Sequence, residues 1–587
     1  MNNNRLAVYT FWEKNGIVRP FVLYYLTGLQ EVAKTIYVVV NGEISNEGRN
    51  SLTSIGCHVI QRENIGVDFW AYKTAIEKEG DLSKYDEVIL CNCSCYGPVY
   101  SFTEMFEDMG KKELDFWGIT EWPYDAMGYK GTWILSYFMV FRRNLFLSKE
   151  WAKYWENLVP VNNRDEAINL HEVKFTKYFS DKGFTYDVYC HNSGKYIDPT
   201  IEAPFELVTK NRCPLIKRKA FCADYDRFLS FHRGNSSKKL LAFLNKSKIY
   251  DINMIFDDML ATQHYYHFKN AINLNYVLPA NVVVAKLDKP VKVAVCMHLY
   301  YEDLLEKNIS YLESLPDFVD IYITTPKKKL VSEIENELHK RAIKVKTIEL
   351  INPRGRAESA FLVATKHFIK DYDFACIVHD KKSSFLQPGC KGEEFGFHNL
   401  DSLLLTKAYV LNILKTFENN PRLGILAPFN VNFAEFRGLP GREWGANFNG
   451  TKNLLQKAFI NVPIAEDVPP VAPMGAMFWF RPKCLEKLVN IDWDYDDFPP
   501  EPLPLDGSLI HCIERAYPFF AQEAGFLTGW LISDYDSETY LNNISYLYRQ
   551  AHIGLINKSV SRNIPKSKKI KNFLKRYANK IFLKRNK

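Results

Sequence analysis

The stretch "CIVHDKKSSF" (376–385) places four ionisable side chains directly after an apolar run. His379, Asp380, Lys381 and Lys382 supply an imidazole, a carboxylate and two ammonium groups. On one interpretation, a buried strand reaches the surface here and simply turns polar. On the other, the strand delivers these groups to the mouth of a sheet, where an anionic ligand binds. The choice depends on the element that carries them.

A second group of reactive side chains lies in "LPLDGSLIHCIERAYP" (503–518). Asp506 opens an Asp-Gly-Ser sequence that is typical of a turn and a helix N-cap, and His511 and Glu514 then share one helix face. A carboxylate at such a position could act as a general base that takes a proton from a hydroxyl group. Asp506 or Glu514 could serve as that base. The alternative is that Glu514 and Arg515 form a structural ion pair.

Two glycine-bearing turns, "ENIGVDF" and "PRGRAES", precede helix-like stretches and are candidate donor-binding elements. Arginines at a helix N-terminus could bind phosphate in a bidentate manner. The alternative for the second turn is a pair of solvated arginines. The residues concerned are Asn64, Gly66 and Asp68 in the first turn and Arg354, Gly355 and Arg356 in the second.

The order of these elements occurs twice along the chain. Each copy has two strand-like runs, then the glycine turn with its helix, then a further strand that begins with Tyr-Asp. Strands that alternate with helices predict βαβ units and a mainly parallel sheet. Such sheets bind ligands outside the carboxyl ends of their strands, which favours a functional role for His379 and Asp380. In the first copy the same place holds Asn92, followed by Cys93.

The length of 587 residues predicts more than one domain. We expect a first lobe at 1–215, a helical connector at 216–290, a second lobe at 291–557 and a basic tail at 558–587. No apolar run approaches the roughly 18 to 20 residues that span a bilayer. The N-terminus also lacks the features of a signal peptide, so we expect a cytoplasmic protein.

The net charge of +7 is distributed unevenly. Residues 558–587 carry twelve Lys or Arg and no acid, which leaves the rest of the chain at −5. A nucleic-acid-binding protein more often places its basic residues on the folded domain, so we expect no nucleic-acid partner.

The tail itself is amphipathic, because Ile570, Phe573, Leu574, Tyr577 and Ile581 recur at helical spacing. Lysines and arginines surround this stripe, a pattern typical of a helix that lies in the interface of an anionic membrane. A disordered, solubilising tail is the alternative.

An α/β domain of this order resembles the nucleotide-sugar-dependent glycosyltransferases of the GT-A type. In that fold the fourth strand ends in a carboxylate that holds a divalent cation, which neutralises the diphosphate of the donor as it leaves. The resemblance implies that Asp380 is the ligand of a Mg²⁺ or Mn²⁺ ion. Lys381 and Lys382 would add positive charge for the departing diphosphate.

The chain also resembles the rhamnan synthesis protein F family of bacterial surface-polysaccharide glycosyltransferases. The similar motifs include "RENIGVDFWAYK", "APFELVTKNRCPLIKRKAF", "YDINMIFDDMLATQ", "HDKKS", "GAMFWFRP" and "EPLPLDGSLIHCIERAYP", and they extend over roughly 5–545. The resemblance implies two tandem GT-A-like lobes. It also implies transfer of L-rhamnose from dTDP-L-rhamnose, with inversion, onto a lipid-linked glycan at the inner face of the plasma membrane.

The chain departs from the family pattern at three places. Cys93 stands where the family has Asp, "WILSYF" replaces a more polar motif, and Ala357 stands where an Asp follows "RGR". Two of these losses fall in the first copy, so we expect the second lobe to be the main catalytic one. A transferase with two active lobes and a non-catalytic glycan-binding or assembly subunit are the alternatives.

Overall fold

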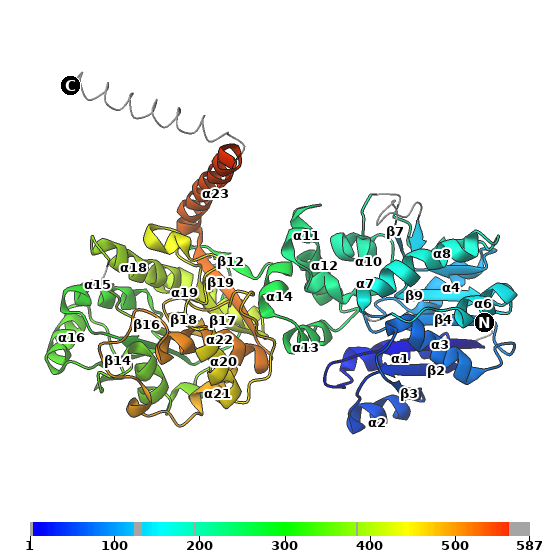
Figure 1. Ribbon diagram of the computed structural model, residues 1–587. Helices are drawn as coiled ribbons and strands as arrows, with labels where there is room; N and C mark the ends of the chain where they lie inside the picture. Colours follow the sequence, from blue (N-terminus) through cyan, green and yellow to red (C-terminus); the bar gives the residue numbers. More distant parts are fainter. Residues whose placement is uncertain (1–3, 123–131, 162, 193–194, 383–385, 563–587) are drawn as a thin grey trace, which may run out of the picture. The chain divides into compact units, whose positions relative to one another are not determined.

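The computed structural model describes residues 4–122, 132–161, 163–192, 195–382 and 386–562, and the chain divides into two compact units (Figure 1). The first unit runs to Leu274 and includes Asn461–Val468. The second comprises Asn275–Ile460 and the residues from Pro469 onward.

The first unit is built on a seven-stranded sheet in the order β10-β6-β9-β4-β1-β2-β3. Only β9 runs antiparallel to its neighbours, and the other pairs are parallel. Its strands are β1 (Arg5–Phe11), β2 (Thr35–Asn41), β3 (His58–Arg62), β4 (Glu87–Asn92), β6 (Phe116–Gly118), β9 (Phe138–Arg142) and β10 (Tyr186–Val188).

The second unit is built on an eight-stranded sheet in the order β12-β19-β17-β18-β16-β13-β14-β15. Here β18 is the antiparallel strand. The strands are β12 (Asn275–Leu278), β13 (Val293–His298), β14 (Val319–Thr325), β15 (Thr347–Leu350), β16 (Phe374–His379), β17 (Leu423–Pro428), β18 (Phe478–Phe480) and β19 (Leu527–Ser533).

Apart from the edge strand β12, the two sheets have the same strand order and the same antiparallel position. The repeat read from the sequence is therefore a repeat of structure. The predicted fold class, two tandem α/β lobes with mainly parallel sheets, is confirmed.

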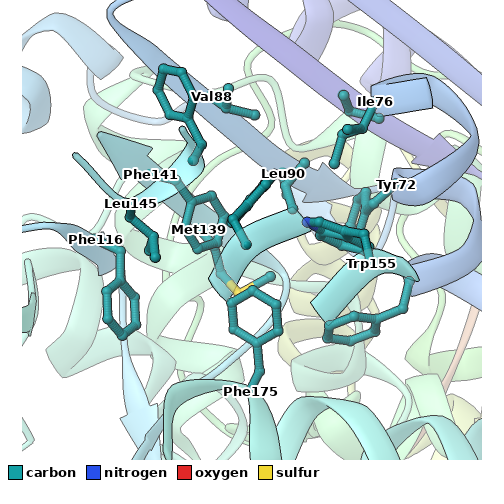
Figure 2. Packing of buried hydrophobic residues seen from close by; sticks show 14 of the residues in the cluster. Tyr72, Ile76, Val88, Leu90, Phe116, Met139, Phe141, Leu145, Trp155 and Phe175 are labelled. Atoms are coloured by element: carbon teal, nitrogen blue, oxygen red, sulfur yellow. The ribbon is translucent and has the colours of Figure 1, made fainter. Parts of the chain in front are cut away.

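The central strands are almost entirely apolar, as expected where helices cover both faces of a sheet. All seven residues of β1 and all six of β13 are buried, as expected for the central strands of a parallel sheet. In the first unit, α3 (Val67–Glu79) packs on β1 and β2, and α6 (Lys149–Glu156) and α8 (Val173–Ser180) contribute aromatic side chains to the same core. Figure 2 shows this core, in which Tyr72 and Trp155 lie against the side chains of β4 and β9.

The segment 216–290 falls in both units. Helices α11 (Tyr225–Leu229), α12 (Ser236–Ser247), α13 (Asn253–Thr262) and α14 (Tyr265–Ala271) belong to the first unit, whereas β12 pairs with β19 in the second. A buried ion pair anchors α13, because Asp258 accepts hydrogen bonds from Arg218 (2.7 and 2.9 Å) and from the Tyr96 hydroxyl. A separate connector domain with the expected boundaries stays a prediction.

Candidate functional site

The residues that follow β4 and β16 occupy equivalent positions in the two units. The Cys93 amide donates to the carbonyl oxygen of Thr10 at 3.0 Å, and the Asp380 amide donates to that of His298 at 3.2 Å. Thr10 and His298 are in register with the final residues of β4 and β16. Asp380 therefore stands where the first unit has Cys93.

The Asp380 carboxylate is buried and is oriented by the main chain. Its Oδ2 accepts hydrogen bonds from the amides of Tyr300 and Tyr301, at 2.7 Å each, and the residue is 5% exposed. Burial raises the pKa of Asp380 to about 6, although the two amides and nearby Lys327 lower it, and Asp303 raises it. The carboxylate is therefore charged at pH 7 and takes up a proton near pH 6.

One ammonium group, that of Lys327, acts on this carboxylate, and a second, that of Lys382, acts on the neighbouring Asp303. Lys327, two residues beyond β14, lies over the ring of Tyr300 at 4.0 Å. Lys382 forms a short ion pair with Asp303. The carboxyl ends of β14 and β16 thus present both signs of charge, and an anion that binds Lys382 would have to compete with Asp303.

His379 connects the end of β16 to Glu514 through Gly475. Its Nε2 lies 2.8 Å from the Gly475 carbonyl oxygen, and the Gly475 amide donates to Glu514 Oε2 at 2.8 Å. Gly475 has φ +95, and a Cβ there would lie 2.6 Å from Asn399 Nδ2, so only glycine fits. Burial lowers the pKa of His379 to about 4. The ring is neutral at pH 7 and serves as a structural link.

Glu514 lies in a buried cluster of charges. Glu514 forms a short ion pair with Arg515, so the structural ion pair that the sequence left open as an alternative is present. The Lys381 ammonium lies over the Phe395 ring at 4.7 Å. Burial lowers the pKa of Lys381, and Glu514 and Glu358 oppose that effect only in part. Burial, with a smaller effect from Glu514, raises the pKa of Glu358 to about 8. The cluster therefore contains two carboxyl groups that cannot both ionise cheaply.

Asp506 ties the turn before α22 (Leu509–Glu523) to the segment at Ala446 and Asn447, whereas the contact of His511 is local. Asp506 accepts hydrogen bonds from the Ala446 amide (2.9 Å) and from Asn447 Nδ2 (2.6 Å). His511 Nδ1 lies 2.8 Å from Ser508 Oγ and caps α22. The structure brings both residues to the end of α22 that carries Glu514, where they hold the turn and the cap.

The turn at Arg354, Gly355 and Arg356 has its expected shape, with Gly355 at φ +85. Its arginines remain in contact with solvent, but each is already paired with a carboxylate. Arg354 Nη1 bonds to Asp496 Oδ1 at 2.5 Å, and Arg356 makes a bidentate pair with Glu501 at 2.6 and 3.0 Å. A phosphate would have to displace these carboxylates.

In the first unit the equivalent turn places Asp68 at the strand ends. Gly66, at φ +78, precedes α3, and Asn64 is exposed in the turn before it. Asp68 accepts hydrogen bonds from the Thr10 hydroxyl (2.8 Å) and from Asn92 Nδ2 (2.9 Å). Two of the predicted first-lobe residues, Asp68 and Asn92, therefore meet at one place, Gly66 shapes the turn before them, and Asn64 lies exposed in that turn.

In the second unit, Ala357 takes the place of Asp68. A cavity of about 20 Å³ is lined there by Ala357, His298 and His379, among others. These three are the counterparts of the residues that hydrogen bond together in the first unit. The cavity has room for about one water molecule.

The predicted metal site can be tested by its donor atoms. Among the residues that the structure describes, no group of three or more His, Cys, Asp or Glu side chains could hold a metal ion. Mg²⁺ is often bound by one or two carboxylates together with substrate phosphates and water. Asp380, with Asp303 nearby, fits that kind of site, and Lys327 and Lys382 face the same carboxylates.

Sequence reasoning did not assign Glu358 or Lys327 to the site. Lys327 could have been found, because it follows a strand whose carboxyl end lies at the same edge of the sheet as Asp380. Glu358 gave a weaker signal, since its chemistry depends on Glu514, which is distant in sequence.

No helix in the described ranges is both long and apolar enough to cross a membrane.

Comparison with known proteins assigns the family. The model of the family described as "Rhamnan synthesis protein F" matches residues 36–526. The chain belongs to the rhamnan synthesis protein F family.

Individual relatives of this rhamnan synthesis family member are distant. The "Uncharacterized protein WxcX" of Xanthomonas campestris pv. campestris (strain B100) is 28% identical over 225 residues. The match covers 38% of this chain and 30% of that protein's length. The chain therefore spans less than a third of the relative it matches.

Solved structures similar to this family member include glycosyltransferases. The glycosyltransferase GlyE of Streptococcus pneumoniae TIGR4 is 12% identical, covers 64% of this chain and 85% of its own, and has a TM-score of 0.23. A mannosyltransferase of Pyrobaculum calidifontis, solved with GDP-Man and Mn²⁺, is 12% identical with coverages of 51% and 88% and a TM-score of 0.21. The fold assignment rests on the strand order instead.

We predict that Glu358→Gln flattens the pH dependence of stability. The folded chain holds a proton on Glu358 that the unfolded chain releases above its ordinary pKa of 4.5. The stability that wild type gains from this difference in pKa is complete below pH 4.5 and is lost as the pH rises through about 8. Denaturant unfolding measures this effect. Between pH 5 and pH 8, the free energy of unfolding of the variant should rise by on the order of 2–4 kcal/mol relative to that of wild type.

The exposed acid Glu486, changed to Gln, is the matched control for this measurement. Parallel stability profiles for wild type and Glu358→Gln would contradict the prediction.

Proposed function

We propose that this protein is a glycosyltransferase whose second unit transfers L-rhamnose from dTDP-L-rhamnose to a lipid-linked cell-surface polysaccharide. Membership of the rhamnan synthesis protein F family supports the sugar and the pathway class. The observation that carries the proposal is the buried Asp380 carboxylate at the carboxyl end of β16, with Lys327 near it and Lys382 paired with the neighbouring Asp303.

The reaction breaks the bond between the sugar C1 and the diphosphate and forms a bond from C1 to an acceptor oxygen. The diphosphate leaves with the electron pair, and its growing negative charge needs stabilisation. Lys327 and Lys382 supply positive charge where the diphosphate would sit. A divalent cation bound by Asp380 would supply more, together with the phosphate oxygens.

The acceptor hydroxyl must lose its proton as it attacks C1. We assign this step to Glu514, which is buried and held by Gly475 and Arg515 beside Lys381. Asp506 and His511 would act as positioning residues, because their contacts fix the start of α22. The neutral carboxyl of Glu358 is unsuited to accept a proton at pH 7.

The place of action would be the inner face of the plasma membrane, where a lipid-linked acceptor is held. The basic tail at 558–587 supports this proposal through its charge. Helix α23 (Asp534–Arg562) leads into the tail, and residues 563–587 lie outside the described part of the chain.

We predict that Asp380→Asn lowers the rate of sugar transfer at least 100-fold and leaves the fold intact. The amide keeps the shape and still accepts from the two backbone amides, but it has no charge for a cation or for electrostatic balance with Lys327. A loss of one such interaction typically costs several kcal/mol in the transition state. Transfer from dTDP-L-rhamnose to a soluble acceptor analogue measures it.

Asp373→Asn is the matched control, because this acid immediately precedes β16 at its opposite end. A rate for Asp380→Asn within about twofold of wild type would favour a non-catalytic assembly subunit instead.

We predict that changes in the first unit slow turnover less than Asp380→Asn does. Asp68→Ala and Asn92→Ala disrupt a network that contains no strand-end acid, since Cys93 takes its place. Values of kcat for the three variants, measured with the same donor and acceptor, test the order. A larger loss in Asp68→Ala would place the main chemistry in the first unit.

We predict that truncation after Asn557 releases the protein from anionic liposomes. Each basic residue near an anionic surface contributes roughly 1 kcal/mol, weakened by salt. Flotation with liposomes that contain phosphatidylserine measures binding, and liposomes of phosphatidylcholine alone are the control. Transfer to a lipid-linked acceptor should slow while transfer to a soluble analogue is spared. Unchanged flotation of the truncated chain would refute the membrane role of the tail.

A further inference from the structure

A chain of polar contacts runs along the carboxyl edge of the first sheet, outside the site proposed for transfer. Asp68 bonds to Asn92, and the Asn92 side-chain oxygen accepts from the Ser94 amide at 3.1 Å. Lys217 Nζ then donates to Ser94 Oγ at 2.9 Å. Asn92 is 7% exposed, so this network is built into the fold and is not a solvated fringe.

Glu172 extends the network from the other side. It lies in the helical segment before β10, and its Oε2 accepts a short hydrogen bond from Ser136. Burial raises the pKa of Glu172, and nearby Lys217 lowers it. Glu172 is the counterpart of Glu514, because each lies on the helical segment before the final strand and bonds to the segment that leads into the antiparallel strand.

The first unit lacks the cations of the second. Strand register and the shared turn align the two units residue by residue at this edge. The cationic positions Lys327, Arg356, Lys381 and Lys382 are occupied in the first unit by Gly42, Val67, Ser94 and Cys95. Two other cations lie near this edge beside carboxyl groups: Lys217 lies near Glu172, and Arg218 is paired with Asp258. A diphosphate would therefore meet fewer cations than at the edge of the second unit, which disfavours a second nucleotide-sugar site.

An exposed aromatic residue follows the strand β1, whose Thr10 belongs to the same network. Trp12 directly follows β1 and is 54% exposed, and its carbonyl oxygen lies 3.7 Å from Cys93 Sγ. An indole ring offers a broad apolar face with little conformational entropy to lose. Sugar rings stack on such faces, and their hydroxyl groups donate to carboxylate and amide oxygens.

We propose that the first unit binds a neutral glycan at Trp12, Asp68, Asn92, Lys217 and Glu172, and does not bind a second nucleotide sugar. Three features favour this ligand class. They are the aromatic face, the hydrogen-bond acceptor oxygens of the network, and the absence of the second unit's cations at matched positions. If the proposed function holds, this glycan is the growing acceptor polysaccharide.

Binding to the full-length chain tests the proposal without relying on transfer. Isothermal titration with a rhamnose oligosaccharide should show one site, and titration with dTDP should also show one site. Trp12→Ala and Glu172→Gln should each weaken oligosaccharide affinity about tenfold or more, and the dTDP affinity should change less than twofold. Trp12→Phe keeps an aromatic face and should retain most of the affinity.

Phe231→Ala is the matched control, because Phe231 is a 50% exposed aromatic of the same unit outside the network. Thermal unfolding confirms that each variant is folded. Two dTDP sites per chain, or oligosaccharide affinity within twofold of wild type in both Trp12→Ala and Glu172→Gln, would overturn the proposal.

The two proposals fail separately. Oligosaccharide binding that depends on Trp12, in a protein that transfers nothing from dTDP-L-rhamnose, would refute the proposed function and leave this site standing. Transfer from dTDP-L-rhamnose by a wild-type protein that binds no oligosaccharide would refute this site and leave the proposed function standing.

Discussion

One backbone hydrogen bond organises each unit: the amide that follows the fourth strand donates to the carbonyl oxygen at the end of the first strand. Because these two strands are parallel neighbours, the bond fixes which side chain turns into the mouth of the sheet. That side chain is Cys93 in the first unit and Asp380 in the second. The surrounding turns, cations and carboxylates are arranged around this position.

The two units carry an acid at different positions of the same scaffold. The first retains an acid in the glycine turn, Asp68, and has lost the acid at the strand end. The second retains the strand-end acid and has Ala357 in the turn, beside a cavity of about 20 Å³. The cations lie with the strand-end acid, where an anionic leaving group needs them. One scaffold thus presents two edges that differ in the cations at matched positions.

Much of the fold could be predicted from the sequence, because buried parallel strands are apolar throughout and end abruptly in polar residues. The position of Asp380 followed from that rule and from the repeat. The partners of Arg354 and Arg356 could not be predicted, since Asp496 and Glu501 lie 142 and 145 residues away in the chain. The same holds for Glu358, whose high pKa depends on burial beside Glu514. The spacing of residues in the sequence predicts which side chains are neighbours within one helix or strand, whereas these interactions join separate elements.

The pairing of β12 with β19 has a consequence for synthesis. A hydrogen bond beside this pair, from the Ala280 amide to Asp534, joins residues 254 apart in the chain. During translation β12 must wait, with its pairing edge open, until β19 has left the ribosome. Open strand edges of this kind invite association with other chains. The second unit is therefore complete only after nearly the whole of its sequence has been synthesised.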